Sequence, residues 1–284
     1  MEKTENTLDD KLRQYYEMLF PEALQENEYI RLVAIRNTTD GTGGSFVRYV
    51  RRFDDYLAFI KRFRHDYDLF NQIATNRGGQ YGTKANQWHR RVLFLDFDRK
   101  VNPGMKTAQD CTTWIHNKLP KLFVHCIVNS GNGFHVYICV PQTEDISDLV
   151  SVNRMIAEIT GADMKAVMPT QISRIPCSYN HKCGTGTDYN NKECWPFVKI
   201  VMNEYGNKTF KPLDLRYLHR MCKEFIFEED TNHVLEKVTW HYEELSDAPQ
   251  YLCIRRAMEE GVEKGQRNFW LGRIVKLLQK QGYT

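Results

Sequence analysis

The chain has 284 residues, of which 42% are hydrophobic and 12% aromatic, so it can bury a substantial core and is not intrinsically disordered. Lysine and arginine (39) exceed aspartate and glutamate (36) by only three, so the net charge alone does not indicate a nucleic-acid partner. No apolar run approaches the roughly 18 residues of a membrane span, and the eight cysteines come without a secretion signal. We therefore expect a cytoplasmic protein with reduced thiols and no membrane partner.

Residues 1–90 are expected to form an α/β module. The apolar spacing over residues 8–20 predicts a helix, which the proline that follows would end. Residues 29–35 are typical of a strand, and residues 53–63 of a second amphipathic helix. The polar, glycine-containing segment 73–84 is predicted to be a connector.

Residues 91–210 alternate strands and helices in the order strand, helix, strand, strand, helix, strand. This order predicts the split β-α-β-β-α-β unit of ferredoxin-like and RNA-recognition-motif (RRM) folds, an antiparallel sheet backed by helices. Residues 211–284 are mostly helical in pattern, so the fold class is α+β with a small helical domain at the end. The expected elements are strand 92–98, helix 105–118, strands 122–128 and 134–140, helix 145–160, and extended segments that end near 175 and 202.

Two carboxylates, Asp96 and Asp98, end the apolar strand 92–98. Side chains two residues apart in a strand point to the same face, so these carboxylates should stand side by side. Mg²⁺ and Mn²⁺ prefer carboxylate oxygens, and two such ions about 3.5–4 Å apart can stabilise the attacking and leaving oxygens of phosphoryl transfer. Taken alone, an Asp-x-Asp pair is more often a strand end that runs into a solvated turn.

The turn Ser130-Gly-Asn-Gly133 lies between two β-rich segments and predicts a hairpin. A glycine-rich turn lets backbone N–H groups approach phosphate oxygens, so Ser130, Gly131 and the turn amides are candidate phosphate ligands. His135 begins the returning strand and could donate to a triphosphate. The alternative for His135 is an ordinary hydrogen-bonded histidine of the sheet.

Three further candidates follow along the chain. Asp163 comes after the helix 145–160 and could supply a third carboxylate to the metal site. Arg174 and Lys182 could neutralise phosphates, the first through its planar fork and the second as a point charge. The alternative is that these residues are ordinary charges of a surface loop.

In this order the residues resemble the archaeo-eukaryotic primase (AEP) superfamily, especially the primase-polymerases of plasmids, phages and mobile elements. The resemblance covers roughly residues 85–200. The hydrophobic Asp-x-Asp motif of the superfamily maps onto Asp96 and Asp98, and its third acid maps onto Asp163. Asp163 is followed by Met-Lys-Ala rather than by an obvious strand, which leaves Asp188 as a second candidate for that acid.

The remaining motifs of the superfamily also map onto this sequence. The Ser-x-His-type motif corresponds to Ser130–His135, and the block Arg-hydrophobic-Pro…Asn-x-Lys corresponds to Arg174–Lys182. In the superfamily the acids hold two divalent metal ions, and the histidine and basic residues hold the triphosphate of the incoming nucleotide. The resemblance therefore implies a nucleotidyltransferase that uses Mg²⁺ or Mn²⁺ and makes primers from NTPs or dNTPs on a single-stranded DNA template.

The resemblance also bears on domain organisation. It implies an AEP catalytic domain over residues 1–210, with the RRM-like module at 91–210. The segment from Cys253 to Leu271 is similar to the helical domain that follows the catalytic module in many of these primases. Residues 211–284 would then form that domain, and a helicase would be a further region of the protein or a partner.

Four soft ligands, Cys177, His181, Cys183 and Cys194, could form a tetrahedral zinc site. Some relatives carry zinc near this position. The spacing is irregular, with three, one and ten intervening residues, so ordinary thiols are the default and zinc the alternative.

Two other functions are compatible with the sequence. An RRM-like module could bind single-stranded nucleic acid without catalysis, and this predicts exposed aromatic residues on the central strands. An Asp-x-Asp phosphatase of the haloacid dehalogenase type usually carries Thr or Val two residues after the second aspartate. Here Arg99 and Lys100 intervene before Val101.

Overall fold

The structure is a computed structural model. It describes residues 2–21, 23–37, 43–79, 81–182, 192–205, 207 and 210–234. The chain divides into two compact units, Met1–Glu228 and Glu229–Thr284. The second unit lies outside the described residues except for the end of one helix, and so do the helices predicted beyond residue 234.

The helices are α1 (Glu2–Leu19), α2 (Phe53–Phe63), α3 (Ala108–Lys118), α4 (Ile146–Thr160) and α5 (Leu215–Val234), with short 3-10 turns η1 (Lys84–Asn86), η2 (Met164–Ala166) and η3 (Lys192–Cys194). The strands are β1 (Glu28–Ile35), β2 (Ser45–Val50), β3 (Asp68–Gln72), β4 (Ala74–Arg77), β5 (Gln87–Asp98), β6 (Cys126–Asn129), β7 (Gly133–Thr143), β8 (Ile172–Arg174) and β9 (Lys199–Asn203).

The described strands form one antiparallel sheet in the order β8-β3-β1-β4-β5-β7-β6-β9, and β2 also pairs with β1. The predicted antiparallel sheet with helices is thus confirmed. The order β5-β7-β6 is the one that a split β-α-β-β-α-β unit requires, but β8 pairs with β3 and not with β5. The fourth strand of the expected unit therefore joins the N-terminal strands instead.

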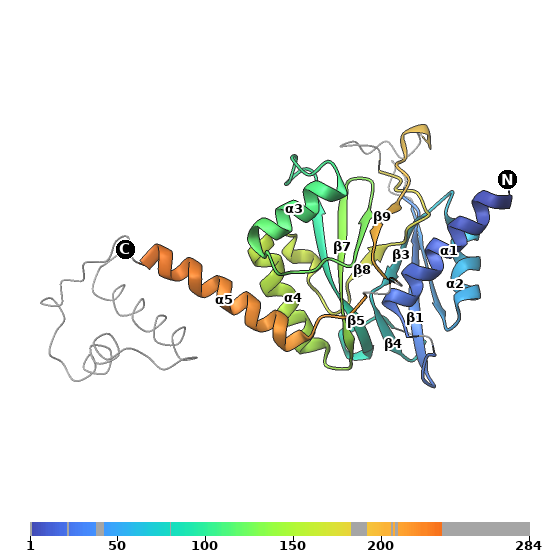
Figure 1. Cartoon of the computed structure of the whole chain (residues 1–284). Coiled ribbons are helices and arrows are strands. Elements are labelled where there is room, and N and C mark those ends of the chain that lie inside the picture. Colours follow the sequence, from blue (N-terminus) through green and yellow to red (C-terminus); the bar gives the residue numbers. More distant parts are fainter. Residues whose placement is uncertain are drawn as a thin grey trace, which may run out of the picture. The chain divides into compact units, whose positions relative to one another are not determined.

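Helices cover both faces of the sheet around β5 (Figure 1). Along β5, Val92 and Phe94 are buried with α1 and α2, whereas Leu93, Leu95 and Phe97 are buried with α3 and α4. This alternation is the period of two that a strand imposes. The near-continuous apolar run of β5 is therefore explained by burial on both faces.

Local sequence defines the two helices that follow β5. Thr107 and Asp110 form a capping box at the start of α3, and Asp145 caps α4 by accepting a 3.0 Å hydrogen bond from the Asp148 N–H. α4 ends at Thr160 and is followed by Gly161, whose φ of +72° is a left-handed conformation suited to glycine. Both ends of α4 lie within one residue of the predicted helix 145–160.

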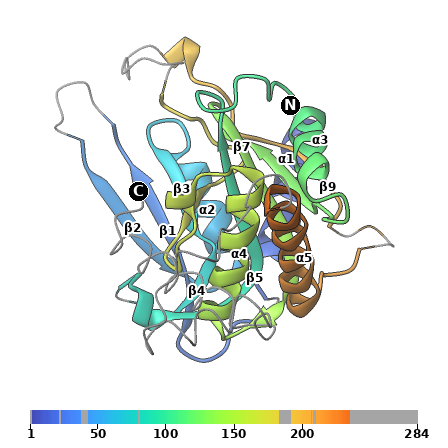
Figure 2. The ribbon, with the colours of Figure 1, turned by 90° about the vertical axis from the view of Figure 1, so that its left-hand side faces the viewer.

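The start of α5 belongs to the first unit. Leu218, Met221 and Cys222 are buried in the cluster that α3 and α4 form with the sheet, which explains why the first unit continues past residue 210 to Glu228. In Figure 2, α4 and α5 lie in front of β5, while β1 and β2 extend to the side. Among the helices of the described residues, none combines the length and apolarity that a bilayer crossing requires.

The strands missing from the sequence prediction are β2, β3 and β4. β2 is an edge strand that is exposed along most of its length. β4 lies in the segment predicted to be a connector, and its Thr75 and Asn76 are buried through hydrogen bonds and not through apolar contacts. β2 and β4 therefore lack the alternation of buried apolar and exposed polar residues by which strands are predicted from sequence.

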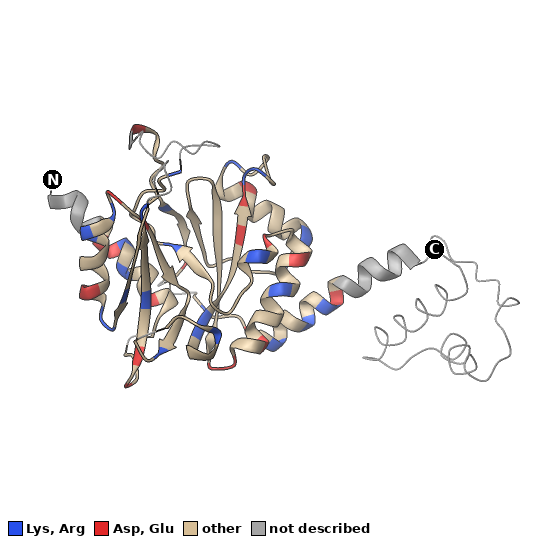
Figure 3. Cartoon of the chain, turned by 180° about the vertical axis from the view of Figure 1, so that it is seen from behind, with Lys and Arg blue, Asp and Glu red and all other residues tan. Residues whose placement is uncertain are grey.

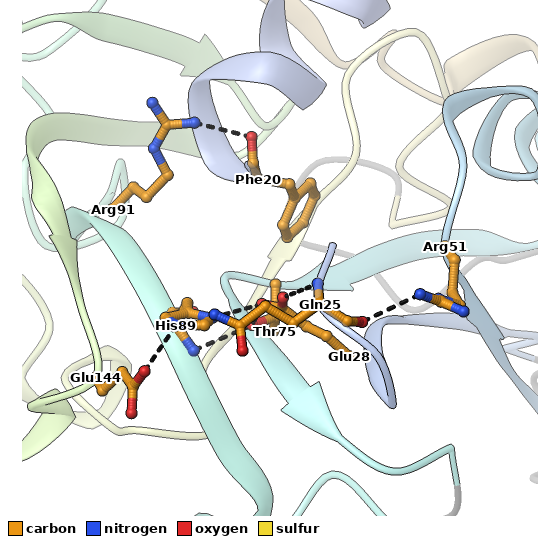
Figure 4. A network of polar contacts seen from close by, with 8 residues as sticks. All are labelled: Phe20, Gln25, Glu28, Arg51, Thr75, His89, Arg91 and Glu144. Carbon is orange, nitrogen blue, oxygen red and sulfur yellow. Dashed lines mark hydrogen bonds and ion pairs between the residues drawn. The ribbon is translucent and has the colours of Figure 1, made fainter. Parts of the chain in front are cut away.

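A buried polar network joins the start of β5 to the N-terminal strands (Figure 4). His89 Nδ1 lies 2.7 Å from Glu28 Oε1, and His89 Nε2 lies 3.2 Å from Glu144 Oε1. The Thr75 hydroxyl also donates to Glu28. Nearby, Arg91 donates to the Phe20 carbonyl just beyond the end of α1, which satisfies an otherwise free helix carbonyl.

Candidate active site

Figure 3 shows lysines, arginines, aspartates and glutamates on the helices and at several strand ends. The aspartates of β5 lie at such an end, and their position follows from register. Asp96 pairs with His135, and Asp98 pairs with Gly133. Because directly paired residues share a face, His135 Nε2 comes to 3.9 Å from Asp96 Oδ1. The acid strand and the hairpin are therefore neighbours in one sheet, with Asp96 and His135 side by side.

The third acid reaches the same place through the turn after α4. The Asp163 N–H donates a 2.8 Å hydrogen bond to the Asp96 carbonyl, so the two residues are backbone neighbours. The Asp163 carboxylate is exposed and accepts from the Lys165 N–H at 2.9 Å. The alternative candidate, Asp188, lies outside the described residues.

The three carboxylates repel one another. Burial, which is the largest cause, and the charges of Asp163 and Asp98 together raise the pKa of Asp96 to about 7, while Arg174 acts in the opposite direction. The Asp96 side chain is 32% exposed, so solvent reaches the cluster. A concentration of carboxylate oxygens with so little positive charge fits hard divalent cations.

Within the described residues, however, no three His, Cys, Asp or Glu side chains are close enough together to form a ready-made metal site. The case for a divalent cation at this site therefore rests on the chemistry of the carboxylate ligands. In addition, the buried Nδ1 atom of His135 has no hydrogen-bond partner among the described residues, so this atom is available to a ligand. Burial and the nearby Arg174 lower the pKa of His135 to about 3, so its imidazole is neutral at pH 7.

The predicted hairpin turn is confirmed, and its conformation requires glycine at Gly131, where φ is +96°. The N–H groups of Ser130 and Gly131 already have internal partners, the carbonyl of Gly133 and Oδ1 of Asn129. A phosphate that bound these amides would have to displace those bonds.

Arg174 is held from two sides. Its Nη1 atom donates to the buried carboxylate of Asp68, and its Cζ atom lies 4.7 Å from the centre of the Phe70 ring. The Arg174 side chain is only 9% exposed, and its charge acts on both Asp96 and His135. The structure therefore fixes a guanidinium beside the carboxylates, although β8 and β5 are not paired.

Lys182 is brought toward the hairpin through Asn180. The Asn180 side chain donates to the Ser130 carbonyl at 2.8 Å and accepts from the Lys182 N–H at 3.0 Å. Lys182 itself is exposed. The hairpin turn and the segment that carries Lys182 are thus tied together by one buried amide.

Asp68 and Asn180 are the supporting residues that the sequence prediction missed. Asp68 is fully buried and also accepts from the His181 N–H at 2.9 Å. A carboxylate directly before the apolar pair Leu69-Phe70 was a usable indication of a buried acid at a strand start. For Asn180 the Asn-x-Lys motif was recognised, but nothing local predicts its bond to Ser130.

The four residues of the predicted zinc site have different surroundings. Cys177 is a free thiol buried with α1 and α2, and burial raises its pKa to about 12. The His181 ring stacks on Trp195 with 3.8 Å between centroids, and Cys194 is disulfide-bonded. Cys183 lies outside the described residues. A disulfide-bonded cysteine is not a thiolate ligand, so zinc binding stays a prediction that would require Cys194 to be reduced.

A basic pocket of about 630 Å³ lies at β1 and β2, away from the three carboxylates. Arg48 and Arg51 line it together with Tyr29 and Tyr49, and the Arg51 guanidinium lies 5.8 Å from the centre of the Tyr29 ring. Tyr29 pairs with Asn76 of β4, and Asn76 pairs with Gln87 at the start of β5. The pocket therefore lies toward the end of β5 that is far from Asp98.

Comparison with known proteins identifies the fold. No model of a protein family matches the sequence, and no curated protein sequence matches it. The AEP domain of the primase-polymerase of cyanophage S-2L superposes with a TM-score of 0.55 at 12% identity, covering 75% of this chain and 97% of that domain. Primase RepB′ gives 0.47 at 11% identity over 80% of this chain and 67% of its own. Its catalytic domain in complex with initiator DNA gives 0.48 at 10% identity, over 81% and 99%.

The similarity to the cyanophage domain shows that this chain has the fold of an AEP domain. The resemblance to archaeo-eukaryotic primases that the sequence motifs predict is thereby confirmed for the fold. At 12% identity the comparison speaks for the fold alone, and the reaction follows from the chemistry of the site.

Proposed function

We propose that the protein is a metal-dependent nucleotidyltransferase, a primase-polymerase that makes primers on single-stranded DNA in the replication of a plasmid, phage or mobile element. One observation carries this proposal. On an AEP fold, Asp96, Asp98 and Asp163 gather at one strand end, next to His135 and Arg174. Such a site catalyses phosphoryl transfer mainly by positioning and by neutralising charge.

Asp96, Asp98 and Asp163 would hold two Mg²⁺ or Mn²⁺ ions. When bound, these ions supply Lewis-acid activation of the attacking hydroxyl and charge neutralisation at the leaving pyrophosphate. The carboxylates themselves bind and orient, and their mutual repulsion gives them a strong preference for a divalent counter-ion.

Arg174, His135 and Lys182 would bind the triphosphate of the incoming NTP or dNTP. Arg174 is already oriented by Asp68 and Phe70, so its fork loses little freedom when it binds phosphate. His135, as a neutral imidazole, can donate one hydrogen bond without adding charge. Lys182 contributes a flexible charge from the segment that Asn180 ties to the hairpin turn.

The single-stranded template would contact the basic pocket of Arg48 and Arg51. Arginines that neutralise phosphates and half-buried tyrosines on which bases can stack are a combination suited to single strands without a sequence code. This part of the proposal rests on the chemistry of the pocket.

The two alternative functions have less support. A binding module of the RRM type needs exposed aromatic residues on its central strands, but Phe94, Phe97, Phe134 and Tyr137 are all buried. A haloacid dehalogenase-type phosphatase is not favoured by a sheet with the fold of an AEP domain.

A primer-extension assay tests the proposal. The wild-type protein is incubated with single-stranded template, with or without a primer, with NTPs or dNTPs, and with Mn²⁺ or Mg²⁺. We expect extension or dinucleotide synthesis that EDTA abolishes, and no product from the variant with Asp96→Ala and Asp98→Ala. Absence of metal-dependent synthesis by the wild type would refute the function, and full activity in the double variant would refute the site.

A further inference from the structure

The two edges of β5 are paired over different lengths of the strand. β7 pairs with β5 on one edge as far as Asp98, but β4 pairs with the other edge only from Gln87 to Arg90. Beyond Arg90 this second edge has no strand partner among the described residues. Its backbone N–H and C=O groups are buried and therefore need other partners.

Asn153, a fully buried residue of α4, supplies two of these partners. Its Oδ1 atom accepts from the Phe94 N–H at 2.8 Å, and its Nδ2 atom donates to the Phe94 carbonyl at 2.9 Å. One side-chain amide thus makes both hydrogen bonds that a residue of a neighbouring strand would have made. Because an amide carries a donor and an acceptor in one plane, it can imitate a peptide group in this way.

The next free carbonyl on the same edge belongs to Asp96, and its donor is the Asp163 N–H at 2.8 Å. α4 ends at Thr160, Gly161 turns the chain, and the Ala162 N–H returns to the Ala157 carbonyl at 2.9 Å. Asp163 is therefore a short, well-defined distance along the chain from the helix that Asn153 anchors. The position of α4 on β5 decides where the Asp163 carboxylate lies.

We propose that Asn153 is a positioning residue of the active site: by binding the Phe94 backbone it fixes α4 on the edge of β5 and holds the Asp163 carboxylate beside Asp96 for divalent-cation binding. The inference rests on the proposed function, because that function assigns Asp163 to the metal-binding set. It also explains the topology, since Asn153 and Asp163 occupy the edge where the fourth strand of a split unit would pair.

The test is a double-mutant cycle read out by Mn²⁺ affinity, measured from the electron paramagnetic resonance of free Mn²⁺. We expect Asn153→Leu to weaken binding about 10-fold, as loss of a residue that orients a metal ligand typically does. Asp163→Ala should weaken it at least as much. The double variant should bind no more weakly than Asp163→Ala alone, because Asn153 acts through Asp163.

Asn76→Leu is the matched control. Asn76 is also fully buried, and its amide also donates one hydrogen bond and accepts one, each 3.0 Å long, but at the opposite end of β5. Both leucine variants should lose thermal stability, whereas only Asn153→Leu should lose Mn²⁺ affinity. If a leucine variant does not fold, Asn153→Ser and Asn76→Ser replace the pair, with the same expected contrast.

The outcomes separate the inference from the function. Additive losses in the cycle, or equal losses of Mn²⁺ affinity in the Asn153 and Asn76 variants, would overturn the role of Asn153 even if the wild type extends primers. A wild type that binds Mn²⁺ but extends nothing would overturn the proposed function while the cycle still decides on Asn153. A wild type that binds no Mn²⁺ would overturn both.

Discussion

At the Gln87 end of β5 the buried carboxylate of Glu28 has three hydrogen-bond partners, the Gln25 N–H, the Thr75 hydroxyl and the His89 ring (Figure 4). At the Asp98 end three carboxylates lie near one another. In the first cluster His89 also contacts Glu144, so the buried acid and the imidazole both have partners. In the second cluster the main neighbours of Asp96 raise its pKa.

The two clusters differ in the way expected of a polar cluster that stabilises the fold and one that is suited to bind a ligand. Buried polar groups whose hydrogen bonds are complete contribute to a unique, rigid fold. Like charges held together cost stability, and a protein retains them where a ligand compensates them. The hydrogen bonds of the Glu28 cluster are made within the protein, whereas we propose that a divalent cation compensates the charges of the Asp96 cluster.

The largest expected effect separates the two ends by activity. Asp163→Ala should lower the rate of nucleotide incorporation at least about 10³-fold, because it removes a carboxylate from the proposed metal-binding set. Glu144→Ala, at the other end of β5, should change the rate less than about twofold, because Glu144 is 63% exposed and belongs to the structural cluster. Steady-state primer extension at saturating nucleotide measures both. Comparable losses in the two variants would remove the contrast between the ends.

The second effect separates the ends by stability. Glu28→Ala should lower the free energy of unfolding by roughly 3 kcal/mol, because it leaves His89 and Thr75 buried without their shared acceptor. Asp98→Ala should cost less than about 1 kcal/mol, because Asp98 is exposed. Urea unfolding followed by circular dichroism provides the measurement. A Glu28 variant as stable as the wild type would show that this cluster does not stabilise the fold.

The third effect is a gain in stability. Because the folded-state pKa of Asp96 is raised from 3.8 to about 7, its ionisation is unfavourable in the fold, and stability decreases as the pH rises between these values. In EDTA, Asp96→Asn should therefore stabilise the protein by about 1–2 kcal/mol at pH 8 and by almost nothing near pH 4. Thermal unfolding at the two pH values tests this. Destabilisation at pH 8 would mean that burial and the neighbouring carboxylates do not disfavour the charged form of Asp96.

The smallest effect concerns the basic pocket. Arg48→Ala combined with Arg51→Ala should weaken binding of single-stranded DNA about 3- to 10-fold and reduce the dependence of binding on salt, because fewer counter-ions are released. Arg62→Ala serves as the control, since Arg62 lies on α2 over the Phe63 ring. Fluorescence anisotropy across a salt series measures the slope. An unchanged slope would place the template elsewhere.

What the sequence predicts well is local. The hairpin follows from an Asn-Gly turn and the acid strand from a short apolar run, and together they bring Asp96 to His135. Helix α2 follows from apolar spacing alone and has the predicted bounds. These features depend on residues close in sequence, so their patterns are visible before folding.

What the sequence does not predict depends on distant pairings. The pairing of β8 with β3 joins residues about a hundred positions apart, and it places Arg174 on Asp68. The bond between Asn153 and Phe94 replaces a strand with a side chain, which no periodicity reveals. The position of Asp163, the acid least supported by pattern, is determined by this replacement.

An anomalous difference map from crystals that contain Mn²⁺ and a nucleotide is the most direct measurement. We predict Mn²⁺ coordinated by carboxylate oxygens of Asp96, Asp98 and Asp163 at roughly 2.0–2.5 Å, with the triphosphate next to Arg174 and His135. A nucleotide bound elsewhere, or a map with no Mn²⁺ at these three carboxylates, would contradict it.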